Sequence, residues 1–154
     1  HLLLEALQTL ALSPEHLLVE VYGAKALPAS LLEQAPSVLR FCGSIPREEL
    51  LERMAVAHAL IFPTLCDGFG LVVNEALSRG LPVITTTRAG AADLIRPGEN
   101  GLHIEAGSSE AIAAAIEAAL TTPSALLTMR SAALCTAADW QWSDYRNAIL
   151  SALQ

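Results

Sequence analysis

The feature that most constrains this chain is a regular alternation of short apolar segments with longer helical segments. Apolar segments that favour strands lie at 16–23, 38–43, 59–63, 81–86 and 102–104. They show little alternation of apolar and polar residues, which is typical of parallel strands buried on both faces. The helical segments between them predict an α/β fold: a Rossmann-like, doubly wound parallel sheet with helices on both faces.

Start and stop signals place the helices between these strands. Expected helices cover 2–11, 28–34, 46–58, 71–79, 108–120, 123–137 and 141–153. Pro46 stands at a helix start and Ser108 at a capping position, whereas Gly80 follows a helix end. The pattern shows no internal repeat and no obvious linker, so we expect one domain over residues 1–154.

Composition narrows the class of protein. Hydrophobic residues make up 53% of the 154 and charged residues 16%, so the chain has material for a core and is not disordered. No apolar run approaches the ~18–20 residues that a membrane helix needs. The net charge is −7, and the eight Arg and one Lys are scattered singly. Nucleic-acid binding is therefore not expected, because it requires a basic stripe.

The cysteines and the first residues give expectations about the cellular compartment and the extent of the domain. Cys42, Cys66 and Cys135 match no zinc or disulfide spacing, so we expect free thiols in a reducing, cytoplasmic compartment. The chain starts at His1 within an apolar helical pattern, without a leading strand or a signal-peptide pattern. This predicts a domain that is truncated at its N-terminus.

The segment richest in chemistry is the loop between the strand 59–63 and the helix 71–79. Ligands of parallel sheets bind at the carboxyl ends of the strands, next to helix N-termini. Gly68 and Gly70 allow the backbone of this loop to approach a ligand closely. The N–H groups of Gly70, Leu71 and Val72 would face outward at the helix start, where the helix dipole favours a phosphate.

A single carboxylate in the following helix adds to this site. Glu75 can lean toward the helix N-terminus and accept hydrogen bonds from two hydroxyl groups, such as those of a ribose. The alternative is that Glu75 forms a surface ion pair with Arg79, four residues later. The sequence leaves both interpretations open.

Read together, these signals resemble a known family. Residues 62–85 read Phe-Pro-Thr-Leu-Cys-Asp-Gly-Phe-Gly-Leu-Val-Val-Asn-Glu-Ala-Leu-Ser-Arg-Gly-Leu-Pro-Val-Ile-Thr. This segment resembles the signature of GT-B glycosyltransferases of the family four type, in which seven residues separate two glutamates. Asp67 and Glu75 keep that spacing, with a shorter acid in first place.

The resemblance extends over nearly the whole chain. The segment 38–43 resembles the family's strand before a helix that contains Glu-Leu, here Glu49-Leu50. Ala89-Gly90-Ala-Ala-Asp93 stands where the family has Gly-Gly-x-x-Glu, and Asn100-Gly101-Leu102 matches its Asn-Gly-Leu.

The resemblance implies the C-terminal, donor-binding half of a retaining hexosyltransferase that uses a UDP- or GDP-sugar. Glu75 would bind the ribose, and Gly70, Leu71 and Val72 the diphosphate. Asp67, Gly68 and Phe69 would face the donor sugar, with Asp67 as a positioning residue rather than a base. Residues near Gly43 and Ile45 would line the nucleotide base.

The resemblance also implies what lies outside the chain. The family uses no metal, so no cofactor is expected, and its Arg and Lys phosphate clamp precedes the first helix. The N-terminal domain would bind a sugar or lipid-linked acceptor and would bring any peripheral membrane association. We therefore expect the chain alone to be inactive. The alternatives are a related GT-B enzyme, such as an epimerase or phosphorylase, and a non-catalytic interaction module with a degenerate pocket.

Overall fold

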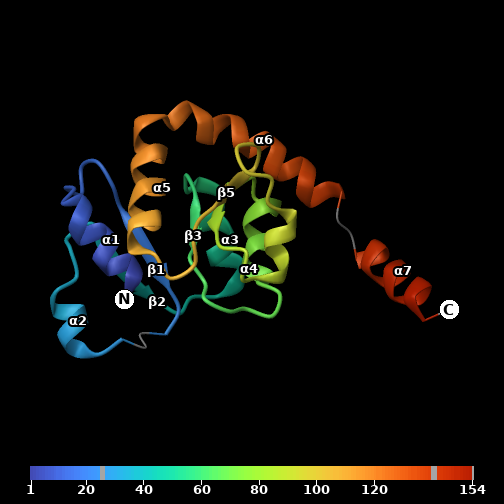
Figure 1. The fold of residues 1–154 in the computed structure, drawn as a ribbon, viewed down its shortest axis with the longest axis horizontal. Coiled ribbons are helices and arrows are strands. Elements are labelled where there is room, and N and C mark those ends of the chain that lie inside the picture. The colour runs from blue at the N-terminus through green and yellow to red at the C-terminus, as the bar shows by residue number, and fades with distance from the viewer. Residues whose placement is uncertain (25–26, 140–141, 154) are drawn as a thin grey trace.

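The computed structural model describes residues 1–24, 27–139 and 142–153, and it alternates strands and helices as expected (Figure 1). In chain order the elements are α1 (Leu2–Leu10), β1 (Val19–Tyr22), α2 (Ala29–Glu33), β2 (Leu39–Gly43), α3 (Arg47–Val56), β3 (Leu60–Phe62), α4 (Leu71–Ser78), β4 (Val83–Thr85), the 3-10 helix η1 (Gly90–Leu94), β5 (Gly101–His103), α5 (Ser109–Thr121), α6 (Pro123–Asp139) and α7 (Trp142–Ala152).

Element boundaries follow local chemistry. Ser108 caps α5 as expected, because its hydroxyl accepts a hydrogen bond from the N–H of Ala111 at 3.0 Å. The first strand is shorter than the expected 16–23. A turn occupies the residues before it, where the N–H of His16 donates to the carbonyl of Ser13 at 3.0 Å. The Ser13 hydroxyl and the His16 ring lie 2.8 Å apart in the same turn. These side-chain and backbone bonds hold the segment before Val19 out of the strand.

The described strands form two parallel sheets with helices on both sides, which confirms the predicted α/β Rossmann-like class. One sheet pairs β1 with β2, and Val19 lies opposite Leu39. The other has the order β3-β4-β5, and Val83 lies opposite Leu60 on one side and Gly101 on the other. Because all pairs are parallel, the carboxyl ends of the strands in each sheet meet at one edge.

The two sheets share a core although the described residues show no ladder between β1 and β3. Ala6, Leu7, Val38, Ile112, Ala113 and Ile116 form this buried cluster. Val19 of β1 and Ile61 of β3 both pack against it, and α5 lies over the place where the sheets meet (Figure 1). Every residue of β4 is buried, whereas β1 and β3 are only half-buried. β1 and β3 are each an edge strand of their sheet.

A second core lies beneath α3, α4 and α6. Its buried members are Leu51, Met54, Val73, Ala76, Leu77, Leu81, Val83, Ala91, Ile95 and Ala133. The helix end at Gly80 packs under α6, where a Cβ would lie 3.1 Å from Cγ of Leu134. Gly80 has a φ of 65°, the left-handed conformation that the sequence signal predicts for a residue after a helix end.

The turn before β5 is tied to α6 by a buried amide. Asn100 is fully buried; its Oδ1 accepts from the N–H of Arg96 at 2.7 Å. Its Nδ2 donates to the carbonyl of Leu94 and to the hydroxyl of Thr136, each at 2.9 Å. The next residue, Gly101, packs so closely on β4 that a Cβ would lie 2.1 Å from the carbonyl oxygen of Val83. The Asn-Gly pair thus has a packing role here.

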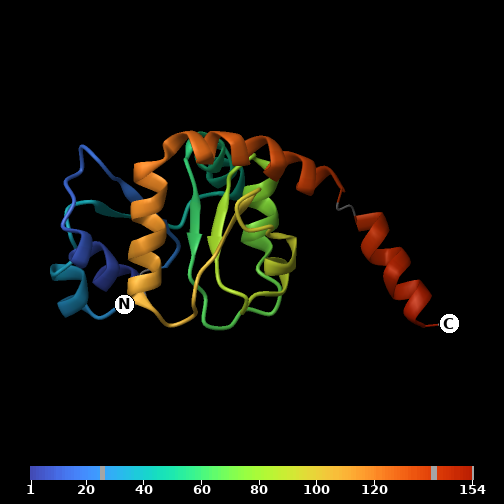
Figure 2. The same cartoon turned by 45° about the horizontal axis from the view of Figure 1, so that its top comes forward.

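The helices at the end of the chain differ in where they lie. Figure 2 shows α6 running across one end of the strands and α7 lying beyond the end of α6. No single helix in the described ranges is long and apolar enough to cross a membrane. The pair α5 and α6 reaches that length and composition only when taken together across a 99° bend.

Candidate functional site

The predicted site residues lie at the carboxyl ends of the strands. The loop after β3 carries Asp67, Gly68 and Phe69, and α4 begins directly after Gly70. Glu75 lies on α4 with 22% of its side chain exposed. On the other sheet, β2 ends at Gly43.

The loop 67–69 is held against the segment that follows β4. The N–H of Asp67 donates to the carbonyl of Arg88 at 3.1 Å, and the N–H of Ala91 donates to the carbonyl of Phe69 at 2.6 Å. The Asp67 carboxylate turns back on its own loop, where Oδ1 accepts from the N–H of Phe69 at 3.1 Å. Asp67 thus shapes the loop, while Phe69 remains 45% exposed.

Two glycines permit this close approach. A Cβ on Gly90 would lie 2.9 Å from the carbonyl oxygen of Gly68, so a larger residue would displace the loop. Gly70 has a φ of 82°, and its Cβ would lie 3.3 Å from that of Ala89. Glycine is therefore required at Gly70 by the backbone conformation and at Gly90 by the space available.

The start of α4 offers unpartnered donors. Gly70 is its N-cap and supplies no side chain to cap the helix. The first N–H groups of an α-helix have no carbonyl partner within the helix, and they carry the positive end of its dipole. The exposed Leu71 and the half-buried Val72 begin this helix. The arrangement suits an anion such as a phosphate.

Glu75 is engaged by a residue that the sequence did not indicate. Its Oε1 lies 2.7 Å from Nε of Arg47, the first residue of α3, which is a charge-assisted hydrogen bond. The alternative considered from the sequence, an ion pair between Glu75 and Arg79, does not form among the described residues. The carboxylate is therefore held toward the loop between β2 and α3.

That loop contains the residues expected near a nucleotide base. Gly43 adopts a φ of 75°, and its carbonyl accepts a hydrogen bond from the N–H of Gly23 at 2.9 Å. Ile45 is half-buried and precedes Arg47 by two residues. The Arg47–Glu75 pair thus connects the Gly43–Ile45 loop with α4, although the two segments belong to different sheets.

Two threonines at the end of β4 form hydrogen bonds around the start of the β3–α4 loop. The hydroxyl of Thr85 donates to the carbonyl of Phe62 at 2.9 Å, and that of Thr86 donates to the carbonyl of Thr64 at 2.6 Å. Both threonines are buried. They join the end of β4 to the end of β3 and the start of the β3–α4 loop, which fixes where the loop leaves the sheet.

Sequence reasoning missed Arg47 and the two threonines, and it named Gly90 only as part of a motif. Arg47 follows a proline at a helix start, so the sequence indicates where it lies in the helix. The sequence does not indicate that its partner is Glu75, 28 residues away. Threonine in a strand is ordinary, because its β-branched side chain suits a pleated surface. The Gly90 signal was present in the Ala89–Asp93 motif, and the close approach to Gly68 gives its physical reason.

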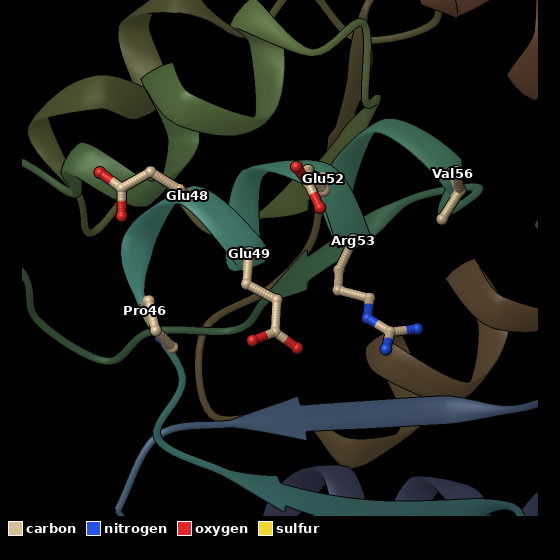
Figure 3. A pocket seen from close by; sticks show the side chains of 6 residues that line it. All are labelled: Pro46, Glu48, Glu49, Glu52, Arg53 and Val56. Carbon is tan, nitrogen blue, oxygen red and sulfur yellow. The ribbon is translucent and has the colours of Figure 1, made fainter.

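A hollow beside the site has the wrong charge for a phosphate. It has a volume of about 640 Å³ and is lined by Pro46, Glu48, Glu49, Glu52, Arg53 and Val56. Figure 3 shows Glu49 and Arg53 extending from α3 toward the side on which β1 and β2 lie. Three carboxylates against one guanidinium would repel a diphosphate. In the described parts of the chain, no three His, Cys, Asp or Glu side chains are placed so that they could hold a metal ion together.

The sequence of this chain is similar to one family of known proteins. A family model described as "Glycosyl transferases group 1" matches residues 1–134. The D-inositol 3-phosphate glycosyltransferase 1 of Catenulispora acidiphila is 30% identical over 106 residues, which cover 69% of this chain and 25% of that enzyme.

Solved structures agree on the fold. Anabaena Alr3699/HepE in complex with UDP has a TM-score of 0.79 and 25% identity, over 99% of this chain and 44% of that one. WaaG, a glycosyltransferase involved in lipopolysaccharide biosynthesis, has a TM-score of 0.74 and 28% identity, over 90% and 38%. The chain thus spans less than half the length of each of these relatives.

Proposed function

This chain belongs to the group 1 glycosyltransferases, and on that basis we propose that it binds the nucleotide-sugar donor of a retaining hexosyltransferase of the family four type. The donor is a UDP- or GDP-sugar, and the acceptor is a sugar or a lipid-linked sugar. The complex of Anabaena HepE with UDP supports a uridine nucleotide as the first ligand to test.

One observation carries this proposal. Glu75 lies on α4, whose N-terminus has no side-chain cap, and its carboxylate is hydrogen-bonded to Arg47, two residues after Ile45. A nucleoside diphosphate presents base, ribose and phosphates in that order. The base then lies at Gly43 and Ile45, the ribose hydroxyls bind Glu75, and the phosphates bind the N–H groups of Gly70–Val72.

The donor sugar then lies beside the loop 67–69. Asp67 is a positioning residue, because its carboxylate already shapes the loop through the N–H of Phe69. In this proposal the leaving diphosphate needs no metal, since preorganised N–H donors and cations stabilise its developing charge. A retaining transfer without a protein nucleophile requires the acceptor to approach the face from which the diphosphate leaves.

We also propose that this chain is one half of the active enzyme and is inactive alone. The short coverage of its relatives supports this, as does the interruption between β1 and β3. Figure 2 shows the start of α1 at the same end of the molecule as the arrowheads of β3 and β4. A strand that led into α1 would therefore run parallel to β3 and β4. The acceptor site and the cationic phosphate clamp would come from outside these 154 residues.

A thermal-shift experiment tests donor binding. UDP at about 100 times its Kd should add about 2.7 kcal/mol to the free energy of unfolding and so raise Tm. GDP and ADP are measured in parallel to identify the base. Glu75→Ala should abolish the shift. Glu99→Ala removes the same charge from an exposed side chain paired with Arg96, and it should keep the shift.

Two results would contradict the proposal. If no nucleotide raises Tm at millimolar concentration, donor binding by these 154 residues fails. If Glu75→Ala and Glu99→Ala respond alike, Glu75 does not bind the ribose. A related GT-B epimerase or phosphorylase is distinguished by product analysis of the full-length protein.

A further inference from the structure

Among the described residues, only Arg47 forms an ion pair with a side chain of the proposed donor site. Its Nε lies 2.7 Å from Oε1 of Glu75, whose side chain is only 22% exposed. The two residues come from different helices, α3 and α4, and are 28 positions apart. The contact is a tertiary one, and it does not follow from the spacing within one helix.

The ion pair with Arg47 restricts the positions that the Glu75 carboxylate can adopt. Glutamate has three rotatable side-chain torsions, so a free carboxylate on α4 would sample many positions. The guanidinium fixes Oε1 toward the start of α3, two residues from Ile45. A carboxylate oxygen can accept more than one hydrogen bond, so Glu75 keeps acceptor capacity for two ribose hydroxyls.

We propose that Arg47 is a positioning residue that orients Glu75 for the ribose and thereby gives the site its preference for ribonucleotides. This inference rests on the proposed donor-binding function, because it assigns Glu75 to the ribose. Arg47 itself touches the carboxylate and not the nucleotide. Its side chain is 65% exposed, so the pair contributes little to folding and its effect falls on ligand binding.

The test compares UDP with its 2′,3′-dideoxy analogue on the full-length protein by calorimetry. Arg47→Met should weaken UDP binding about three- to fivefold, the size expected for the loss of an exposed ion pair. The dideoxy analogue should bind equally well to the unmodified protein and to Arg47→Met, because it lacks the hydroxyls that would donate hydrogen bonds to Glu75. Arg47→Lys should recover part of the loss, since an ammonium can also donate to Glu75 but lacks the fixed direction of a guanidinium.

Arg40→Met is the matched control. Arg40 is 64% exposed and pairs with Glu20 at 3.7 Å on the β1–β2 sheet. The variant removes the same charge without touching Glu75, so UDP affinity should not change. Glu75→Gln should lower UDP affinity and remove any further effect of Arg47→Met in the double variant.

Each other outcome overturns the inference. Equal UDP binding by Arg47→Met and the unmodified protein excludes a positioning role. Equal weakening of UDP and the dideoxy analogue shows that Arg47 acts on the phosphates or on general charge. If the unmodified protein does not bind UDP, GDP or ADP, the proposed function fails and the inference fails with it. Only a loss confined to the ribonucleotide supports Arg47 as a positioning residue.

Discussion

Gly90 determines how closely the loop 67–69 can approach the segment after β4. Its Cβ would lie 2.9 Å from a backbone oxygen, that of Gly68, which cannot rotate away as a side chain would. We predict that Gly90→Ala lowers the free energy of unfolding by about 1–3 kcal/mol, the usual cost of overpacking. Urea denaturation measures this change. Gly68→Ala is the control, since its Cβ would meet nothing within 4 Å. Similar effects of the two substitutions would contradict the steric explanation.

Tyr22 provides a prediction about pH. Its partial burial, together with its hydrogen bond to Glu20 at 2.9 Å, raises its pKa from 10.0 to about 12. The folded state therefore favours the neutral phenol. Its contribution to stability is fully present below pH 10 and is lost as the pH rises toward 12.

The titration of tyrosinate absorbance checks this, with Tyr22→Phe used to subtract the signal of Tyr145. Glu20→Gln should lower the pKa of Tyr22 toward 10, because it removes the negative charge that opposes ionisation. A Tyr22 that titrates near 10 in the unmodified protein would refute the prediction.

At the scale of elements, the sequence was sufficient for the order of strands and helices but not for every contact. Apolar segments and helix signals predicted the strands and the α-helices, because these elements depend on neighbouring residues. The pairing of Arg47 with Glu75 depends on how α3 and α4 pack. The half-buried state of β1 and β3 likewise depends on which strands lie beside them. Such features are properties of tertiary structure, and local patterns do not contain them.

Arg130 on α6 donates hydrogen bonds to the C-terminal end of α3. From α6, its two terminal nitrogens donate to the carbonyls of Ala57 at 2.8 Å and Ala55 at 2.7 Å, at the end of α3. The last carbonyls of a helix lack partners within it, so this guanidinium caps α3 across 73 residues of sequence. The cap anchors the helix whose first residue is Arg47.

We predict that Arg130→Met destabilises the fold by about 1–3 kcal/mol, because two carbonyls lose charge-assisted hydrogen bonds. Arg96→Met is the control; its ion pair with Glu99 is 4.0 Å long and exposed, and its loss should cost less than about 0.5 kcal/mol. Chemical denaturation compares the two. If both variants have the same midpoint, the contacts of Arg130 do not stabilise α3.

At the scale of the whole molecule, the interruption between the sheets makes a specific prediction about hydrogen exchange. The N–H groups of Leu60 and Val19 point toward β4 and β2, where they donate to the carbonyls of Pro82 and Val38 at 2.9 and 2.8 Å. Because N–H direction alternates along a strand, those of Ile61 and Glu20 point toward the interruption. In the 154-residue chain, the amides of Ile61 and Glu20 should exchange much faster than those of Leu60 and Val19.

The same four amides test whether a strand joins the two sheets in the full-length protein. If a parallel strand lies between β1 and β3, the amides of Ile61 and Glu20 gain carbonyl partners and should become as protected as Leu60 and Val19. Leu60 and Val19 serve as internal controls, because their partners are already within the described sheets. Slow exchange of Ile61 and Glu20 in the isolated chain, or fast exchange in the full-length protein, would show that the sheet is not completed in this way. Protection that appears only in the full-length protein would mean that the proposed donor site is built on one continuous sheet, with the Gly43–Ile45 loop and α4 held at a fixed separation.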